Sequence, residues 1–344
     1  MRVECGDIPY YLEYDPEKLS GLRSALLQLP DGLKQYSREI ADCLSSTLGA
    51  NIIIDANSTY GACDLRYEES QRLGVEAIIH VGHTPYPDYL GDRTHVNPSG
   101  RVKVVFVAAR FKRTPGATAL EGLVDALGRR GIRRVGLVTT TQYIDSYRVA
   151  KEFLQARGFS VVNFRGPEKY YEEGQVIGCD YSFVPRGVDG YVIVTSGEFH
   201  AIGLYLATLK PVIELDVHKG LAVDMTKEGE KIYARRLYAI SQAMDSRRWG
   251  VIVGLKTGQY RPWIVNALTF ALRRRGYEYR LIEAETLNEQ VLRNIDSEWY
   301  RSFVVTSCPR IPIDDLSYYE KPILAPGEAF MAIEKKLQPY RFPW

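Results

Sequence analysis

The sequence predicts an α/β protein of three similar domains, each built on a parallel sheet and arranged around a pseudo-threefold axis. Three times, an apolar strand ends in a polar, Gly- or Thr-rich turn and is followed by an amphipathic helix and another strand. The three repeats begin about 110 to 115 residues apart, which is close to a common domain size. Strands that alternate with helices favour parallel sheets with helices on their faces. We therefore place the domains at residues 1–112, 113–247 and 248–344.

The first repeat sets the pattern of elements. An apolar strand with its turn occupies residues 24–34, a helix is expected at 35–49, and a second strand at 51–56. A third strand follows at 76–85, and a fourth is expected at 102–109. The helix ends at a glycine, which suits the left-handed position that commonly closes a helix.

The second and third repeats have the same order of elements, and each of their helices also ends at glycine. Their first strands and turns lie at 133–143 and 249–259, helices at 144–158 and 261–276, second strands at 160–164 and 277–285, third strands at 189–200 and 302–312, and short fourth strands at 210–216 and 321–326. The agreement of three repeats supports one architecture used three times.

Composition excludes several classes of protein. Hydrophobic residues make up 45% and charged residues 25% of the chain, as in an ordinary globular protein. A net charge of +2 gives no reason to expect nonspecific binding to nucleic acid or to a membrane surface. No apolar run reaches the roughly 20 residues of a membrane span, and the start of the chain does not have the pattern of a secretion signal. We expect a cytoplasmic protein.

The five cysteines do not have the pattern of a disulfide-rich protein. Their number is odd, they are widely spread, and no CxxC motif occurs. These features argue against a disulfide framework. Cys43 lies in a helical pattern and is expected to be buried filler, and Cys5 lies in a possible edge strand without a recognisable partner.

The other three cysteines each follow a strand of a different repeat. Cys63 and Cys179 lie in the loops after the second strands, and Cys308 ends a third strand. In open parallel sheets functional residues gather at the carboxyl ends of strands. Three thiolates could bind an iron–sulfur cluster, zinc or copper(I) and leave one position open for a substrate. By spacing alone, three unlinked cysteines in turns remain the alternative.

Two histidines also have a spacing that suggests metal binding. His80 and His83 lie three residues apart at the end of a strand. Residues three apart in a strand face opposite sides of the sheet. We therefore expect these histidines to form hydrogen bonds and not to bind a metal.

Five motifs together resemble those of one enzyme family. They are TYGACD around Cys63, HVGHTPYP at 80–87, GQVIGCDYS around Cys179, GLKTGQ at 254–259 and CPRIPIDD at 308–315. The family is that of 2-(3-amino-3-carboxypropyl)histidine synthase, the first-step enzyme of diphthamide biosynthesis, in its archaeal single-subunit form. Any one motif is a weak signal, whereas five in the family's order, over essentially the whole chain, are specific.

The resemblance implies three α/β domains in a triangle, with Cys63, Cys179 and Cys308 as ligands of one [4Fe–4S] cluster. It also implies an unusual radical use of S-adenosylmethionine, without the CxxxCxxC motif of the large radical superfamily. The cofactor is split into methylthioadenosine and a 3-amino-3-carboxypropyl fragment. The fragment is transferred to an imidazole carbon of a histidine in translation elongation factor 2.

Further residues receive roles as candidate contacts of S-adenosylmethionine. Gly254, Gly258 and Gln259 form a strand-to-helix turn whose amides could hold a carboxylate, or which could be an ordinary tight turn. Arg310 could pair with the methionine carboxylate or be a surface arginine. His200 resembles a family position that lines the central cavity, with a core histidine as the alternative; the family often has proline where this chain has Ala201.

The resemblance also implies partners and leaves two rival functions. An electron donor is required, and the family's archaeal members imply a homodimer. The rivals are a quinolinate-synthase-like [4Fe–4S] dehydratase and a three-domain small-molecule binding protein with structural zinc. The motifs above fit quinolinate synthase less well. Release of methylthioadenosine separates the two enzymes, and a brown colour separates both from a zinc protein.

Overall fold

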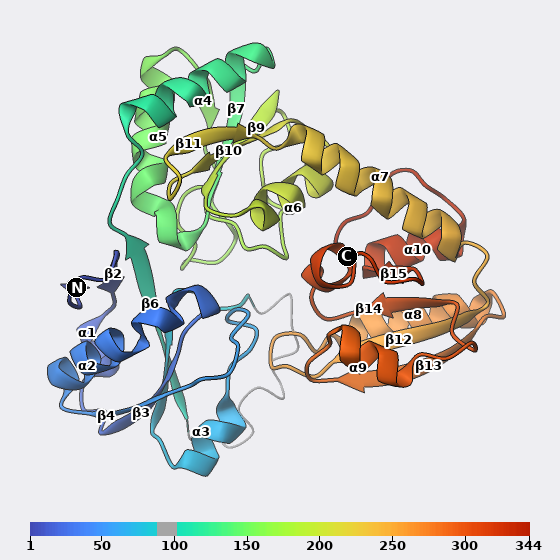
Figure 1. Cartoon of the computed structure of the whole chain (residues 1–344), viewed down its shortest axis with the longest axis horizontal. Coiled ribbons are helices and arrows are strands. Elements are labelled where there is room, and N and C mark those ends of the chain that lie inside the picture. Colours follow the sequence, from blue (N-terminus) through green and yellow to red (C-terminus); the bar gives the residue numbers. More distant parts are fainter. Residues whose placement is uncertain (88–101) are drawn as a thin grey trace.

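Three β-sheets organise residues 1–87 and 102–344, which are the part of the chain that the computed structural model describes (Figure 1). Each sheet takes its strands from one stretch of the sequence, and the three stretches follow one another along the chain. Helices separate most of the strands and pack against the sheets. The predicted α/β class with several parallel sheets is confirmed.

The first sheet has the order β1, β2, β6, β5, β3, β4 within the described residues. Its strands are β1 Arg2–Glu4, β2 Tyr10–Glu13, β3 Ser24–Gln28, β4 Asn51–Ile54, β5 Ala77–Val81 and β6 Lys103–Phe111. The four strands of the predicted repeat are parallel to one another. In addition, β1 and β2 form an antiparallel hairpin that pairs with β6. The sequence predicts an edge strand near Cys5 but not the full hairpin.

The second sheet has the order β11, β10, β9, β7, β8, and the third β13, β12, β14, β15. The strands are β7 Arg134–Thr139, β8 Ser160–Val162, β9 Gly190–Thr195, β10 Val212–Asp216, β11 Leu221–Asp224, β12 Arg248–Gly254, β13 Glu278–Ala284, β14 Ser302–Val305 and β15 Ile323–Leu324. Only β11 runs antiparallel to its neighbour among these described strands. The carboxyl ends of the parallel strands therefore lie at one edge of each sheet.

The helices of the described residues include the three that the sequence predicts, each of which ends within two residues of its predicted end. They are α1 Pro16–Leu19, α2 Ser37–Leu48, α3 Tyr67–Leu73, α4 Ala117–Arg129, α5 Ile144–Ala156, α6 Glu198–Thr208, α7 Thr226–Ala243, α8 Pro262–Arg274, α9 Glu289–Ile295 and α10 Pro326–Glu334. Gly49, Gly158 and Gly276 follow the three repeat helices with φ of 65°, 81° and 68°, so the left-handed closing residues are confirmed. Across the described residues, every helix is too short or too polar to cross a membrane.

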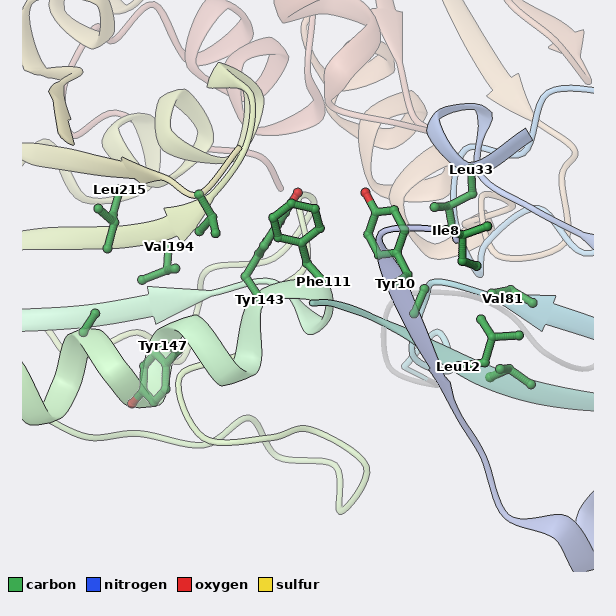
Figure 2. Packing of buried hydrophobic residues seen from close by; sticks show 14 of the residues in the cluster. Ile8, Tyr10, Leu12, Leu33, Val81, Phe111, Tyr143, Tyr147, Val194 and Leu215 are labelled. Carbon is green, nitrogen blue, oxygen red and sulfur yellow. The ribbon is translucent and has the colours of Figure 1, made fainter. Parts of the chain in front are cut away.

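One hydrophobic cluster joins the first two sheets, as Figure 2 shows. Leu12 of the first sheet and Val194 of the second are both fully buried in it. Phe111 and Tyr143 lie between the sheets, with their ring centroids 5.9 Å apart. A fully buried large apolar side chain stabilises a fold by about 1.5–3 kcal/mol. The first two sheets are therefore held together by a common core.

Helix α7 runs from the second sheet toward the third (Figure 1), where it meets α10 through a buried ion pair. Arg236 Nη2 lies 2.6 Å from Glu328 Oε2, and the two side chains are only 3% and 0% exposed. The same arginine donates hydrogen bonds to the carbonyl oxygens of Pro312 and Ile323, each at 2.6 Å. Tyr340 donates to Glu328 Oε1 at 2.7 Å. The pair thus fixes α7 against the segment that follows Cys308.

A disulfide between Cys5 and Cys43 corrects the prediction that the cysteines of this chain do not pair. Their Cα atoms are 5.4 Å apart, because strand β1 packs beside helix α2. The two residues are separated by 38 positions: Cys5 directly follows β1, and Cys43 lies in α2. No local sequence motif predicts this pairing, because it depends on where the chain after β1 lies relative to α2 in the folded protein.

Glu328→Ala tests the buried ion pair. The substitution leaves Arg236 buried without its counterion, so we expect the free energy of unfolding to fall by about 3–5 kcal/mol. Lys231→Ala on the same helix is the matched control, because its pair with Glu228 is exposed and contributes less than about 1 kcal/mol. Urea unfolding followed by circular dichroism measures both. Equal losses in the two variants would contradict the structural role assigned to the pair.

Candidate metal centre

A cavity of about 550 Å³ is lined by loops of all three sheets. Cys63, Cys179 and Cys308 all line it, and each is half-buried. Their loops follow β4, β8 and β14, one strand from each sheet. The structure therefore brings together the three cysteines that the sequence singled out.

The Cys63 loop is held by the turn after β12. The amide of Gly258 donates to the carbonyl oxygen of Cys63 at 2.8 Å, and Thr257 Oγ1 donates to Leu65 O at 3.1 Å. A Cβ atom on Gly258 would lie 2.7 Å from Cys63 Cα. This close approach of two backbones requires glycine. The first and third sheets thus meet at the first candidate ligand.

A buried ion pair reinforces that junction. Lys256 Nζ lies 2.7 Å from Asp64 Oδ1, and both side chains are 4% exposed. Two charges this deeply buried stabilise the protein only while they stay in contact, because no water is available to solvate either charge if the pair separates. The pair therefore fixes the position of the residue next to Cys63.

The Cys179 loop folds against β7 and also contacts the segment that follows β5. Backbone hydrogen bonds join Thr139 to Gly174 and Val176 at 2.8 and 2.9 Å, which places the segment beside the sheet. The Tyr86 hydroxyl lies 3.7 Å from Cys179 Sγ, within hydrogen-bond distance for sulfur. Cys179 is thus held between its own sheet and the segment that follows β5.

Cys308 lies three residues after the end of strand β14, so the expectation that it ends the strand is wrong. Pro309 follows it and has no backbone N–H to donate. The chain then turns into a short wide helix at Ile311–Asp315, and the Ile311 amide donates to Cys308 O at 3.2 Å. This turn directs the loop with its thiol toward the cavity.

Burial disfavours the ionised form of the three thiols. It raises the pKa of Cys179 and of Cys308 to about 12, and it also raises the pKa of Cys63. Cys63 and Cys308 both add to the shift of Cys179, so the sulfurs lie within electrostatic range of one another. The thiols on their own are neutral at neutral pH. A bound metal supplies the positive charge that a set of thiolates needs.

The two histidines of the first domain contact each other. His80 Nε2 and His83 Nδ1 are 2.9 Å apart, which confirms the expected hydrogen bonding. The expectation that they face opposite sides is wrong, because β5 ends at Val81 and Gly82, with φ of 91°, turns the chain. Burial lowers the pKa of His83 to about 4 and that of His80 well below its usual value. The pair is therefore uncharged at neutral pH.

The turn at residues 254–259 contacts the Cys63 loop more than the cavity. The amides of Gly258 and Gln259 donate to carbonyl oxygens of Cys63 and Lys256, so the protein already uses both. Gly254 packs against Ser307, whose Cβ would lie 2.3 Å from an added Cβ. Of the three predicted residues, only Gln259 lines the cavity, and its amide nitrogen lies 3.5 Å from Cys63 Sγ.

Arg310 and His200 both line the cavity. The Arg310 side chain is 50% exposed, pairs with Asp314 at 3.3 Å and lies over the Phe199 ring at 5.2 Å. Burial lowers the pKa of His200 to about 4, and the charge of Arg310 contributes to this shift. The arginine therefore provides a positive charge beside Cys308, and the histidine a neutral polar group.

Among the cavity residues that sequence reasoning did not single out are Tyr86 and Arg261. Both line it, and the Arg261 guanidinium donates a hydrogen bond to the Tyr86 hydroxyl across 175 positions of sequence. Each lies within or next to a motif that resembles the family, HVGHTPYP and GLKTGQ. That proximity was the available signal, but it does not indicate which polar residue faces the site.

Comparison with known proteins finds relatives over nearly the whole chain. Residues 29–341 match the family described as "Putative diphthamide synthesis protein". A 2-(3-amino-3-carboxypropyl)histidine synthase from Pyrococcus horikoshii is 33% identical and aligns with 90% of this chain and 86% of its own length. Subunit 1 of the human enzyme of that name is 27% identical, over 90% of this chain and 68% of its own length.

Solved structures of a relative have the same fold. Dph2 from Pyrococcus horikoshii matches 95% of this chain and 90% of its own, with a TM-score of 0.78 and 30% identity. A second structure of Dph2 from that organism contains a 4Fe-4S cluster. It matches 94% of this chain and 88% of its own, with a TM-score of 0.75 and 30% identity.

Gly258→Ala tests the contact that holds the Cys63 loop. The added methyl group meets backbone and not a flexible side chain, so we expect a loss of about 1–3 kcal/mol in the free energy of unfolding and faster alkylation of Cys63. Gly128→Ala in α4 is the control, because an added Cβ there meets nothing within 4 Å and alanine favours helix. Denaturant unfolding and mass spectrometry of alkylated peptides give the two readouts. An unchanged Gly258→Ala protein would contradict the tight junction.

Proposed function

We propose that this chain, which belongs to the diphthamide synthesis protein family, transfers the 3-amino-3-carboxypropyl group of S-adenosylmethionine to a histidine of translation elongation factor 2. The observation that carries the proposal is the arrangement of three cysteines, one from each sheet, around a single cavity. The named activity of relatives at 33% and 27% identity supports the choice of reaction.

The cavity suits a [4Fe–4S] cluster better than a single metal ion. In residues 1–87 and 102–344, no three His, Cys, Asp or Glu side chains are placed to hold one ion. A cluster contains several irons, so each thiolate can bind a different one and the sulfurs can lie further apart. Gln259 and Tyr86 lie within hydrogen-bond distance of two of the sulfurs, as partners of cluster ligands do. We propose Cys63, Cys179 and Cys308 as the ligands.

The chain's own residues orient the cofactor. When bound, the cluster supplies the electron that cleaves the sulfonium bond to the methionine γ-carbon. Arg310 carries the positive charge that suits the methionine carboxylate, and Gln259 offers a side-chain amide on the same wall. His200 is neutral and can donate or accept one hydrogen bond without adding charge. Their shared task is to present one carbon–sulfur bond to the electron source.

The protein substrate must reach this cavity with a single side chain. A volume of about 550 Å³ is the size of a small-molecule site and not of a protein interface. We therefore infer that elongation factor 2 presents its histidine on a protruding segment. An electron donor, a homodimer and a cytoplasmic location complete the proposal, and all three rest on the family resemblance.

The rival functions lack a supporting observation. The family match over residues 29–341 favours the transferase over a quinolinate-synthase-like dehydratase. A structural zinc site would need ligands around a single ion, and the described residues provide no such trio. We propose no second function.

Substitution of single cysteines tests the ligand set. We expect Cys63→Ala, Cys179→Ala and Cys308→Ala each to lose most of the iron after anaerobic reconstitution, because thiolates hold the irons. Cys43→Ala is the control and should keep its iron. Cys43 forms a disulfide with Cys5, and neither residue lines the cavity. Iron and sulfide content and the visible absorbance measure the outcome. Full iron content in all three loop variants would refute the assignment.

The products of S-adenosylmethionine cleavage test the reaction. We expect reduced protein to release methylthioadenosine with little 5′-deoxyadenosine, because the proposed reaction cleaves the bond to the γ-carbon. With elongation factor 2 present, label in the methionine carboxyl carbon should enter one histidine, and label in the methyl group should not. Chromatography and peptide mass spectrometry provide the readouts. A main product of 5′-deoxyadenosine, or methyl label in the factor, would exclude the proposed transfer.

A further inference from the structure

A second cavity lies at the far end of the third sheet from the three cysteines. It has a volume of about 450 Å³ and is lined by residues around the starts of β12, β14 and β15. Strands β12 and β14 run from here toward the first cavity, which lies beyond their carboxyl ends. Among the described residues, none lines both cavities, so the two are separate sites.

Three cations form a row across the start of the sheet. Arg248 begins β12, Arg301 directly precedes β14, and Lys321 lies two residues before β15. The register of the parallel strands places Arg301 between the other two, and its amide donates to the Arg248 carbonyl oxygen at 3.0 Å. Neighbouring strands lie about 4.8 Å apart, so side chains at matching positions lie close together. All three residues line the second cavity.

Two cations of this row have no counterion. Lys321 Nζ pairs with Asp296 at 2.5 Å, and Asp296 does not line the cavity. Arg248 lies over the Trp299 ring at 5.9 Å, but neither it nor Arg301 forms an ion pair or a side-chain hydrogen bond with another described residue. Like charges on neighbouring strands repel each other, so an anion that bridges them would be stabilised by both.

The other charged residues of the cavity leave an excess of positive charge. Arg247 lies over the Tyr277 ring at 4.9 Å and has no ion-pair partner among the described residues. Glu320 is paired with Arg293, which lies outside the cavity, at 2.8 Å. Asp245 is the one carboxylate of the cavity without an ion-pair partner in the described part of the chain. Three unpaired guanidinium groups therefore outnumber one unpaired carboxylate.

A buried hydrogen bond fixes the spacing of the row. The hydroxyl oxygens of Ser246 and Ser302 lie 2.6 Å apart, and Trp249 Nε1 donates to the Ser246 carbonyl oxygen at 3.2 Å. All three residues are buried. These contacts join the starts of β12 and β14, and so they hold the backbones of the two unpaired arginines side by side.

The end of helix α7 does not account for the row. The helix ends at Ala243, and a cation that follows a helix complements its dipole. Arg247 is near enough in sequence to serve in this way. Arg301 and Lys321 precede other strands, however, and are brought to the cavity by the register of the sheet.

We propose that the second cavity binds a small phosphate compound whose phosphate oxygens bridge Arg248 and Arg301. A guanidinium can donate two parallel hydrogen bonds to a carboxylate or a phosphate. One arginine occupies both oxygens of a carboxylate, whereas a phosphate has oxygens for two arginines. A volume of about 450 Å³ is in the range of small-molecule sites. The site goes beyond the proposed transfer reaction and does not depend on it.

Calorimetry with pyrophosphate tests this site in the reconstituted full chain, at low ionic strength where charges are weakly screened. We expect Arg248→Gln and Arg301→Gln each to weaken the affinity about tenfold or more, because each removes charged hydrogen bonds to the ligand. Arg274→Gln is the matched control and should keep the affinity. Arg274 is exposed and lies over the Phe270 ring at 5.8 Å, but it does not line the cavity. Succinate, a dicarboxylate, should bind more weakly than pyrophosphate.

Further outcomes decide where the anion binds and of which class it is. Arg310→Gln removes a cation from the cavity of the three cysteines and should keep the affinity. Binding that is lost in Arg310→Gln but intact in Arg301→Gln would place the anion in that other cavity and overturn the inference. Equal affinities for succinate and pyrophosphate would exclude a phosphate site, and no binding of pyrophosphate to the wild-type chain would exclude the site altogether.

Two controls keep these outcomes interpretable. If circular dichroism shows that Arg248→Gln does not fold, Arg301→Gln decides by the same criteria. Iron content, measured on the same samples, reports separately on the cluster of the proposed function. Failure to bind pyrophosphate therefore leaves the proposed function standing, and failure to assemble a cluster leaves the anion site to be judged by calorimetry.

Discussion

The junction between Lys256 and Asp64 is the contact on which the geometry of the cavity depends. Both charges are almost fully buried at 2.7 Å, and each is stable only in the presence of the other. The pair lies next to the Gly258–Cys63 backbone contact, so it sets how closely the third sheet approaches the first. One wall of the cavity is therefore fixed by electrostatics and close packing, independently of any bound metal.

The loop that carries Cys308 is held by two buried arginines. Strand β14 ends at Val305, so the carbonyl groups of the loop that follows cannot all find partners in a sheet. Arg261 donates to Thr306 and Ser307 on one side of the cysteine, and Arg236 donates to Pro312 on the other. These hydrogen bonds give an irregular loop fixed partners on both sides of Cys308. Such support keeps the thiol on the cavity that the other two cysteines line.

Local patterns in the sequence predicted the repeat, and long-range contacts account for what they missed. Apolar strands and the glycines at 49, 158 and 276 have signals within a few residues, and the structure confirms them. The rule for strand ends suggested that Cys63, Cys179 and Cys308 lie on functional loops, and the family resemblance implied that they share one site. The Cys5–Cys43 disulfide and the Arg261–Tyr86 hydrogen bond join segments far apart in the sequence, with 175 positions between the latter two. Such contacts depend on how the sheets pack, for which a single sequence contains no local signal.

The contact between Lys256 and Asp64 also has a consequence for biosynthesis. The two residues are separated by 192 positions, which a ribosome needs about 10 to 40 s to translate. During that interval the Cys63 loop exists without the turn that holds it, and its thiol is open to oxidants. If the three cysteines bind a metal as proposed, its loading must follow the emergence of the third sheet, and the nascent thiol must stay reduced until then.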